Sequence, residues 1–369
     1  MKISVIFYVC VFFIVSCSMP KEQKEVKLDL KSKVPLESVE SYLQIEDLVR
    51  ISTNEAFIAK FDKMIPCDDE IYVMDGMQNA IFKIDVRSKS VSKLIDNVGA
   101  ARNEYLCITD FTIDGERNLL IYDSDSEKIN VYDPSGHYVR TMKACCGTSL
   151  AISEHGLIGI NTGQLEEEQF AVLSQEGDEL HNVVYDITYP NFDFGNVRSV
   201  APWEDGFVFT VPFDYHIYEV DGATIAPLAM LNCGEKQCDV EALKKLDIAA
   251  CRDAIFKMND KIMYFSNLTV CNNKIFFSTD MNDQILYDYG NDCVMVVSNV
   301  ESPYNILFST PLYVNESGQF CNVITNSNIM NAYIPSIEVR GVKSPKLNIR
   351  REELSEEDNS FWILRGKVK

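Results

Sequence analysis

A short acidic segment, DSDSEK from Asp123 to Lys128, places three carboxylates within five positions. Carboxylate oxygens bind Ca²⁺, but a helix-loop-helix calcium loop needs a glycine at its sixth position and a glutamate at its twelfth. The sixth position of this segment is Lys128. We therefore interpret the segment as a hairpin connection between two strands, and it predicts no metal site.

Histidine is a common general base and metal ligand, and the chain has four: His137, His155, His181 and His216. No two of them stand at i, i+2 or i, i+4, so none pair on one strand or helix. His137 follows the turn sequence PSG and His155 precedes a glycine, so both are expected at the surface. A composite site from distant histidines stays open, but no motif supports one.

Covalent catalysis would need a nucleophile beside a base, and the sequence has neither a GxSxG elbow nor a recognisable Cys/His arrangement. Zinc binding is disfavoured too, because no CxxC occurs and no histidine stands near a cysteine pair at ligand spacing. The sequence therefore predicts no catalytic residue, no metal and no cofactor.

The chain contains twelve cysteines. Cys233 and Cys238, in CGEKQC, could close a small loop through a disulfide, and Cys145 and Cys146 are adjacent. Cysteines inside strand-like runs, such as Cys107 and Cys293, are expected to be buried thiols that pack as small apolar groups. The sequence leaves open which thiols, if any, are oxidised.

Residues 1–16 are predicted to be a secretion signal. Lys2 precedes an apolar run from Ile3 to Val15, which is too short to cross a bilayer as a helix. The run ends in IVSC, which resembles the bacterial lipobox and implies cleavage before Cys17 and lipid attachment to it. The alternative is an ordinary signal peptide with a chance cysteine. Several acyl chains would hold the protein almost permanently at a membrane.

The formal charge of −21 argues against a nucleic-acid partner, because phosphates would be repelled. Contact with a membrane is therefore expected only through the lipid anchor. Residues 17–41 are predicted to be the anchored segment and a flexible tether, since Lys21 to Val34 is rich in Lys, Glu and Gln.

From residue 42 onward, short runs of Ile, Val, Tyr and Phe alternate with turn residues. A similar hairpin pattern recurs at 71–85, 120–133, 207–221 and 275–288. Four strands in each unit of about 40 to 50 residues are typical of a β-propeller. One such sheet has two apolar faces, and packing copies around an axis buries both. The length fits an all-β, six-bladed propeller of four-stranded antiparallel blades over 42–369; the rival is a β-sandwich.

Two inserts interrupt the repeats, and both are expected to contain short helices. The first, near 239–259, has Leu243, Leu246, Ala249 and Ala250 at helical spacing and neither proline nor glycine. The second lies near 335–355.

The stretch from Asn97 to Lys143 resembles the six-bladed β-propeller lipoproteins of Bacteroidetes, relatives in fold of NHL and TolB-like propellers. Their pattern is a glycine-rich turn ending in Glu and an aromatic, then a DFxID strand and an IYVYD … KIxVYDxxG hairpin. The matching residues are Gly99, Glu104, Tyr105, Asp110, Phe111, Ile113, Asp114, Tyr122, Asp123, Ile129, Tyr132, Asp133 and Gly136. The family's Gly-Pro-Gly is replaced by Ala101, Arg102 and Asn103, and the ending DNSFWILRGKVK resembles its closing strand.

The resemblance places this turn between the outer strand of one blade and the inner strand of the next, near the channel mouth. It makes Gly99, Arg102, Asn103, Glu104 and Tyr105 candidate ligand-binding residues of a rim loop. Arg102 and Glu104 could contact a ligand; the alternative is a surface salt bridge or a turn contact.

A second segment, 191–206, is rich in aromatics. Phe192, Phe194 and Trp203 are expected to fill the wedge between blades, and the alternative is a carbohydrate-binding face.

The functional hypothesis is a monomeric, lipid-anchored, non-enzymatic module of the cell envelope that binds a peptide, protein or glycan. The alternative is a propeller enzyme of lyase or lactone hydrolase type with a metal at the channel axis. The periplasmic face of the outer membrane is favoured over the cell surface, since the residues after Cys17 lack an acidic run.

Overall fold

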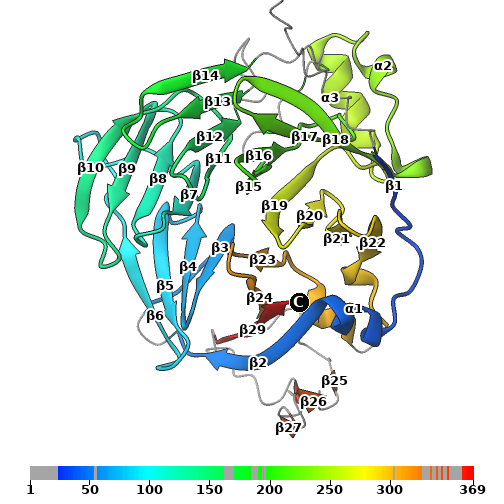
Figure 1. Ribbon diagram of the computed structural model, residues 1–369, viewed down its shortest axis with the longest axis horizontal. Coiled ribbons are helices and arrows are strands. Elements are labelled where there is room, and N and C mark those ends of the chain that lie inside the picture. The colour runs from blue at the N-terminus through cyan, green and yellow to red at the C-terminus, as the bar shows by residue number, and fades with distance from the viewer. Residues whose placement is uncertain are drawn as a thin grey trace, which may run out of the picture.

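The computed structural model describes residues 24–53, 56–161, 170–183, 190, 192, 194, 197–301, 304–325, 333–334, 338–339, 342–343, 347–348 and 360–369. Six blades, each with four strands paired in antiparallel fashion, stand around one axis (Figure 1). This confirms the predicted six-bladed, all-β propeller.

Each blade runs from an inner strand at the axis to an outer strand at the rim (Figure 1). The inner strands are β3 (Lys63–Cys67), β7 (Asp110–Ile113), β11 (Ser149–Ile152), β15 (Val200–Trp203), β19 (Phe265–Cys271) and β23 (Tyr313–Val314). The second strands are β4 (Glu70–Asp75), β8 (Leu119–Asp123), β12 (Ile158–Asn161), β16 (Gly206–Phe209), β20 (Lys274–Thr279) and β24 (Gln319–Thr325). The third strands are β5 (Ala80–Asp85), β9 (Lys128–Tyr132), β13 (Phe170–Leu173), β17 (His216–Asp221), β21 (Gln284–Asp288) and β29 (Phe361–Val368). The outer strands are β6 (Ser90–Ile95), β10 (Tyr138–Lys143), β14 (Glu179–Val183), β18 (Thr224–Asn232), β22 (Cys293–Val296) and β2 (Leu43–Ile51).

The hydrophobic core lies between neighbouring blades. Leu120 and Ile129 of the second blade, for example, share a buried cluster with Leu150 and Ile160 of the third. Both faces of a middle strand are therefore covered, and all five residues of β8 are buried. This two-sided burial is why the middle strands read as continuous apolar runs rather than as alternating patterns.

The sixth blade joins the early strand β2 to strands near the C-terminal end of the described chain. The outer strand β2 pairs with β29, and β29 pairs with β24 on its other side. In register, Leu43 lies opposite Val368, and Gln319 lies opposite Lys367. Backbone hydrogen bonds between the ends thus close the ring.

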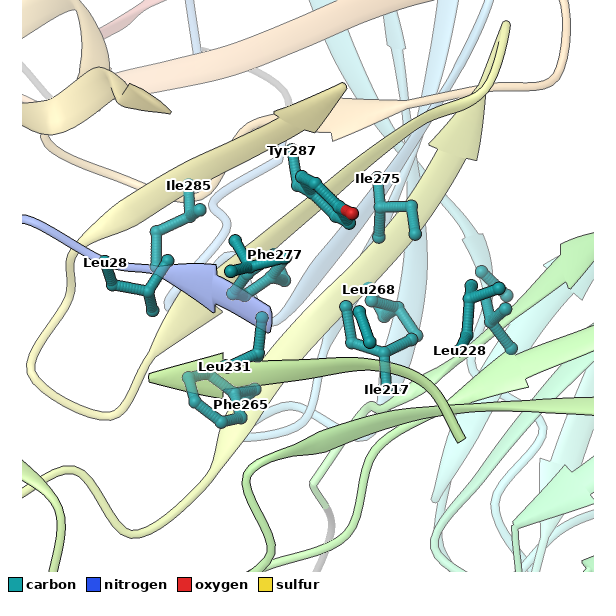
Figure 2. Packing of buried hydrophobic residues seen from close by; sticks show 14 of the residues in the cluster. Leu28, Ile217, Leu228, Leu231, Phe265, Leu268, Ile275, Phe277, Ile285 and Tyr287 are labelled. Carbon is teal, nitrogen blue, oxygen red and sulfur yellow. The ribbon is translucent and has the colours of Figure 1, made fainter. Parts of the chain in front are cut away.

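The expected tether is wrong from Lys24 onward. Strand β1 (Lys24–Lys27) pairs in parallel with β18 and adds a fifth strand to the fourth blade. Val26 and the following Leu28 are only 4% and 5% exposed. Figure 2 shows Leu28 among the side chains of the neighbouring blade, beside Ile285 and Phe277. Helix α1 (Leu36–Tyr42) follows this strand. The segment is mostly polar, but a small number of buried apolar residues attach it to the ring.

The insert near 239–259 contains helices α2 (Val240–Leu243) and α3 (Ile248–Lys257), as predicted. Asp239 and Asp247 cap them: each side chain accepts a hydrogen bond from a backbone N–H three residues later, at 3.0 and 2.8 Å. Short 3-10 turns also occur at Gly234–Lys236, Val297–Asn299 and Tyr304–Phe308.

For the insert near 335–355, the helix prediction is wrong in the part that the structure describes. There the chain forms short strands, β26 (Glu338–Val339), β27 (Val342–Lys343) and β28 (Leu347–Asn348), and β25 (Tyr333–Ile334) precedes them. Pro335, Gly341 and Pro345 oppose a helix, and β-branched residues between them favour strands. The other residues of this insert lie outside the described residues.

All cysteines among the described residues are free thiols, including the buried Cys233 and Cys238. The burial predicted for Cys107 and Cys293 is wrong, since both are exposed. Cys107 lies in a loop rather than a strand, and Cys293 begins the outer strand β22.

No helix in the described part of the chain is long and apolar enough to cross a membrane.

Candidate functional site

A cavity of about 390 Å³ lies along the axis, and residues of all six inner strands line it. It extends from the beginning of these strands, at Lys63 and Leu150, to the turns after them, at Asp68 and Asp114. We call the first region the inner end and the second the mouth. Its volume is within the usual range of small-ligand pockets.

The wall between the two ends is largely apolar. Its side chains include Ile152, Pro202 and Val270 from three different blades. Thr269 also lines the cavity, and its Oγ1 is buried without a hydrogen-bond partner among the described residues. Each inner strand pairs with a neighbour on only one side within its sheet, so its second edge faces the axis.

Three charged side chains meet near the inner end. Lys63 begins β3, Asp110 begins β7, and Arg198 lies two residues before β15. Lys63 Nζ is 2.8 Å and Arg198 Nε is 3.7 Å from the same Asp110 oxygen, Oδ1. The Asp110 side chain is 1% exposed and each cation is 17% exposed.

Asp110 is fully engaged. Its Oδ1 also accepts a hydrogen bond from its neighbour Phe111 N–H at 2.8 Å, and its Oδ2 accepts one from Leu150 N–H at 3.0 Å. Burial lowers the pKa of the Lys63 ammonium, Asp110 opposes that change, and Arg198 adds to it. Arg198 Nε is buried and has no hydrogen-bond partner in the described part of the chain.

The mouth has the opposite charge balance. Asp68, Asp114 and Glu316 line it, and Arg117 is the cation among them. Arg117 is engaged with a fourth acid, since its guanidinium lies 3.0 Å from Glu70. The channel is therefore positive at its inner end and negative at its mouth.

The predicted rim loop does not line this cavity: none of Gly99, Arg102, Asn103, Glu104 and Tyr105 is among its lining residues. The loop joins β6 to β7, as the resemblance implied, but it is held by its own hydrogen bonds. Gly99 N–H donates to the Tyr105 carbonyl at 2.9 Å, and Glu104 Oε2 accepts from Ala101 N–H at 2.8 Å. A Cβ on Gly99 would lie 2.1 Å from that carboxylate oxygen.

The outer strands of the second blade hold the same loop. Asn130 Nδ2 donates to the Glu104 carbonyl at 2.8 Å, and Thr141 Oγ1 donates to the Arg102 carbonyl at 2.9 Å. The buried Tyr105 hydroxyl donates to the Asn79 carbonyl at 2.9 Å. Glu104 thus makes a turn contact, one of the two alternatives for this position, and a ligand-binding role for the loop stays a prediction.

A family model described as a domain of unknown function, DUF4934, matches residues 48–364. The chain belongs to the DUF4934 family. No curated protein matches it in sequence. Most of the ring, from β2 to β29, lies within the matched range.

Solved structures share the fold of this DUF4934 propeller. A proposed exported protein of Bacteroides fragilis has a TM-score of 0.64 at 14% identity, covering 94% of this chain and 99% of that one. A DUF4221 family member of Bacteroides vulgatus has a TM-score of 0.54 at 10% identity, covering 89% and 98%. A streptogramin B lyase reaches 0.48 at 11% identity, covering 88% and 98%. At these identities the similarity concerns the fold alone.

The other chemically interesting residues are separated. Three histidines each contact a nearby aspartate: His137 with Asp133, His155 with Asp205 and His216 with Asp214. Within the described ranges, no three His, Cys, Asp or Glu side chains are grouped as metal ligands.

The DSDSEK segment connects β8 to β9, as predicted. Asp123 is buried and accepts hydrogen bonds from Leu106 N–H at 2.7 Å and Ser126 N–H at 3.1 Å. The carboxylate therefore stabilises local turns.

Trp203 packs between two blades, as expected, whereas Phe192 and Phe194 pack beside the helical insert. The Phe192 and Phe194 rings meet edge to face, with ring centroids 4.7 Å apart. Trp203 is 3% exposed and lies edge-on to Tyr289. These rings are contacts between elements rather than an open carbohydrate-binding face.

Asp280 is a carboxylate that the sequence analysis missed. Its Oδ2 accepts a hydrogen bond from Met263 N–H at 3.0 Å, but its Oδ1 is buried without a partner among the described residues. Burial raises the pKa of Asp280 to about 6. No local motif marks it, because its neighbours Met263 and Cys233 are 17 and 47 positions away in the sequence.

Asp280→Asn should stabilise the protein at pH 7. A raised folded-state pKa favours the protonated form, so the stability of the native chain falls as pH rises from about 4 to about 6. The variant should lack that fall and gain about 1–2 kcal/mol at pH 7, after allowance for solvent screening. Urea unfolding at pH 4.5 and pH 7 measures this, with the exposed Asp253→Asn as control. Equal pH dependence in both variants would contradict it.

Proposed function

We propose that this protein is a lipid-anchored, monomeric binding module of the cell envelope that takes a peptide into its axial cavity. The cavity along the six inner strands carries this proposal, because it is the concave surface on which all blades converge.

A peptide suits this cavity better than a glycan. The inner strands present unpaired backbone edges to the axis, and an extended peptide can satisfy such groups. The apolar wall accepts apolar side chains. Glycan sites commonly use aromatic platforms, whereas Tyr313 is the one aromatic residue in the described lining.

Binding suits the charged groups better than catalysis. A general base needs a free lone pair in reach of substrate, but both oxygens of Asp110 already accept hydrogen bonds. Lys63 and Arg198 are cations that hold anions. These groups therefore support recognition at the axis, and the metal-dependent lyase or hydrolase alternative gains no support from them.

The envelope location rests on two supports. The lipobox-like IVSC places an acylated Cys17 before the ring, although Cys17 lies outside the described residues. The Bacteroides fragilis structure with the same fold is described as a proposed exported protein. We place the protein on the periplasmic face of the outer membrane, as a lipoprotein of the Bacteroidetes propeller type.

Cys17→Ala should release the protein from the membrane. Without the thiol no diacylglyceryl group can be attached, so the variant should appear in the soluble fraction and incorporate no labelled palmitate. The control is Cys107→Ala, which removes an exposed thiol of the ring and should change neither result. Lipid labelling that persists in Cys17→Ala would contradict the anchor.

Thr269→Trp should block peptide binding by filling the cavity. Equilibrium dialysis against a pool of apolar tripeptides, read by mass spectrometry, should show retention by the native chain. Retention should fall at least tenfold in Thr269→Trp. The matched control is Val139→Trp, at an exposed position of the outer strand β10, which should retain peptides normally. Absence of retention by the native chain would refute peptide binding.

A further inference from the structure

Among the described residues, the charged cluster at the inner end of the channel has two cations and one anion. Lys63 and Arg198 both approach Asp110 Oδ1, at 2.8 and 3.7 Å, and Asp110 is the one carboxylate of the described chain that forms an ion pair with either of them. All three side chains are at least four-fifths buried. An uncompensated charge is costly in such surroundings, because burial removes its hydration.

The protein supplies no second acceptor for Arg198 in its described part. The Nε group is buried and unpaired, and its distance to Asp110 Oδ1 exceeds that of a hydrogen bond. The nearby Tyr313 hydroxyl donates to the Asp62 carbonyl at 3.1 Å, so it does not neutralise the guanidinium. Asp110 already accepts from Lys63 and two backbone N–H groups.

A carboxylate would complete this arrangement. The planar guanidinium matches a carboxylate through two parallel hydrogen bonds, and such charge-assisted pairs are among the strongest available. Lys63 lines the cavity, so an anionic group at the inner end reaches it directly. Arg198 is not a lining residue; it lies beside Lys63, since both cations approach the same Asp110 oxygen.

The charged residues at the mouth indicate the charge at the other end of the ligand. Asp68, Asp114 and Glu316 outnumber Arg117 there, which favours a positive group. Between the two ends the wall is apolar, with Ile152 as one example. A ligand with an anion inside, an apolar body and a cation outside matches this order.

We propose that the channel binds short apolar peptides by their C-terminal carboxylate, held at the inner end by Lys63 and Arg198, with the free amine at the acidic mouth. This deepens the proposed function and rests on peptide binding in the axial cavity.

The test compares two pools of the same apolar tripeptides, one with free C-terminal carboxylates and one with C-terminal amides. Equilibrium dialysis with the full-length native protein should retain the acid pool at least tenfold better than the amide pool. Arg198→Met should remove that preference by lowering retention of the acid pool, while Arg198→Lys should keep part of the preference. Arg140→Met, at an exposed position of β10, is the matched control and should bind like the native chain.

The outcomes separate the two levels of the proposal. Equal retention of both pools by the native protein would overturn carboxylate recognition and leave peptide binding in place. Retention of neither pool would overturn peptide binding itself. Arg198→Met is expected to fold, because Asp110 keeps Lys63 as its counter-charge at 2.8 Å and the methionine side chain fills much of the space of the arginine stem.

Discussion

Replacing Gly366 by alanine should weaken the closing blade and lower the free energy of unfolding by about 3 kcal/mol. Gly366 lies in β29, between β2 and β24. A Cβ at this position would lie 2.1 Å from the Gln44 carbonyl oxygen and 2.5 Å from the Phe320 ring. The first of these atoms belongs to the backbone of the partner strand, so relief requires moving β2 away from β29.

The effect should be large because β29 contacts two strands that come from opposite ends of the described chain. Separation of β2 from β29 breaks the backbone hydrogen bonds that β2 makes with β29 along residues 43–51. It also exposes the clusters on either side of the sixth blade, which contain Leu43, Ile363 and Leu364. Without this contact, the apolar faces of the sixth blade and its neighbours are no longer fully buried against one another.

Urea unfolding followed by circular dichroism measures the change, and Gly115→Ala is the control. Gly115 lies in the β7–β8 turn, where an added Cβ meets no atom within 4 Å, so that variant should differ from the native chain by less than about 0.5 kcal/mol. If Gly366→Ala were as stable as Gly115→Ala, the closing contact would not limit the stability of the ring.

The repeat architecture could be predicted because it depends on local patterns. Strand–turn–strand units with apolar runs, such as those at 71–85 and 120–133, occur in the structure as β4–β5 and β8–β9. The helical insert at 239–259 was predicted from the helical spacing of its apolar residues and its lack of proline and glycine. These signals lie within a few residues of one another, so a single sequence contains them.

Predictions that required long-range contacts failed. The segment at Lys24–Lys27 looks polar, and only its pairing with β18 and the burial of Val26 make it part of the ring. Cys107 looked like a strand residue because its neighbours are apolar, but it lies in an exposed loop. In both cases tertiary contacts determine the outcome, and local composition does not reveal them.

The candidate site was hidden for a related reason. Asp110 was noted as part of a DFxID strand, but nothing in the sequence connects it to Lys63, 47 positions away, or to Arg198. What these residues share is a place at the beginning of an inner strand. Because the inner strands all begin at the same end of the channel, aligning the six blades by their inner strands would have brought these residues together.

Replacing Asp110 by asparagine should destabilise the protein by about 3–5 kcal/mol, because it leaves Lys63 and Arg198 buried without a counter-charge. The asparagine oxygen can still accept a hydrogen bond, so the loss comes mainly from charge rather than shape. The measurement is urea unfolding at pH 7. The control is Asp125→Asn, at an exposed position in the same blade, which should change stability by less than about 0.5 kcal/mol.

A double-mutant cycle separates this charge effect from a packing effect. Lys63→Met combined with Asp110→Asn should be more stable than Asp110→Asn alone, because it removes one of the two uncompensated cations, with a coupling of about 1–3 kcal/mol.

The pH dependence of stability gives a second criterion. The folded-state pKa of Lys63 is already lowered, and loss of Asp110 lowers it further, so the unfolded state binds more protons and stability rises with pH toward 10. The deficit of Asp110→Asn should therefore shrink between pH 7 and pH 10. A deficit that is independent of pH and additive with Lys63→Met would mean that Asp110 contributes only packing and hydrogen bonds at this position.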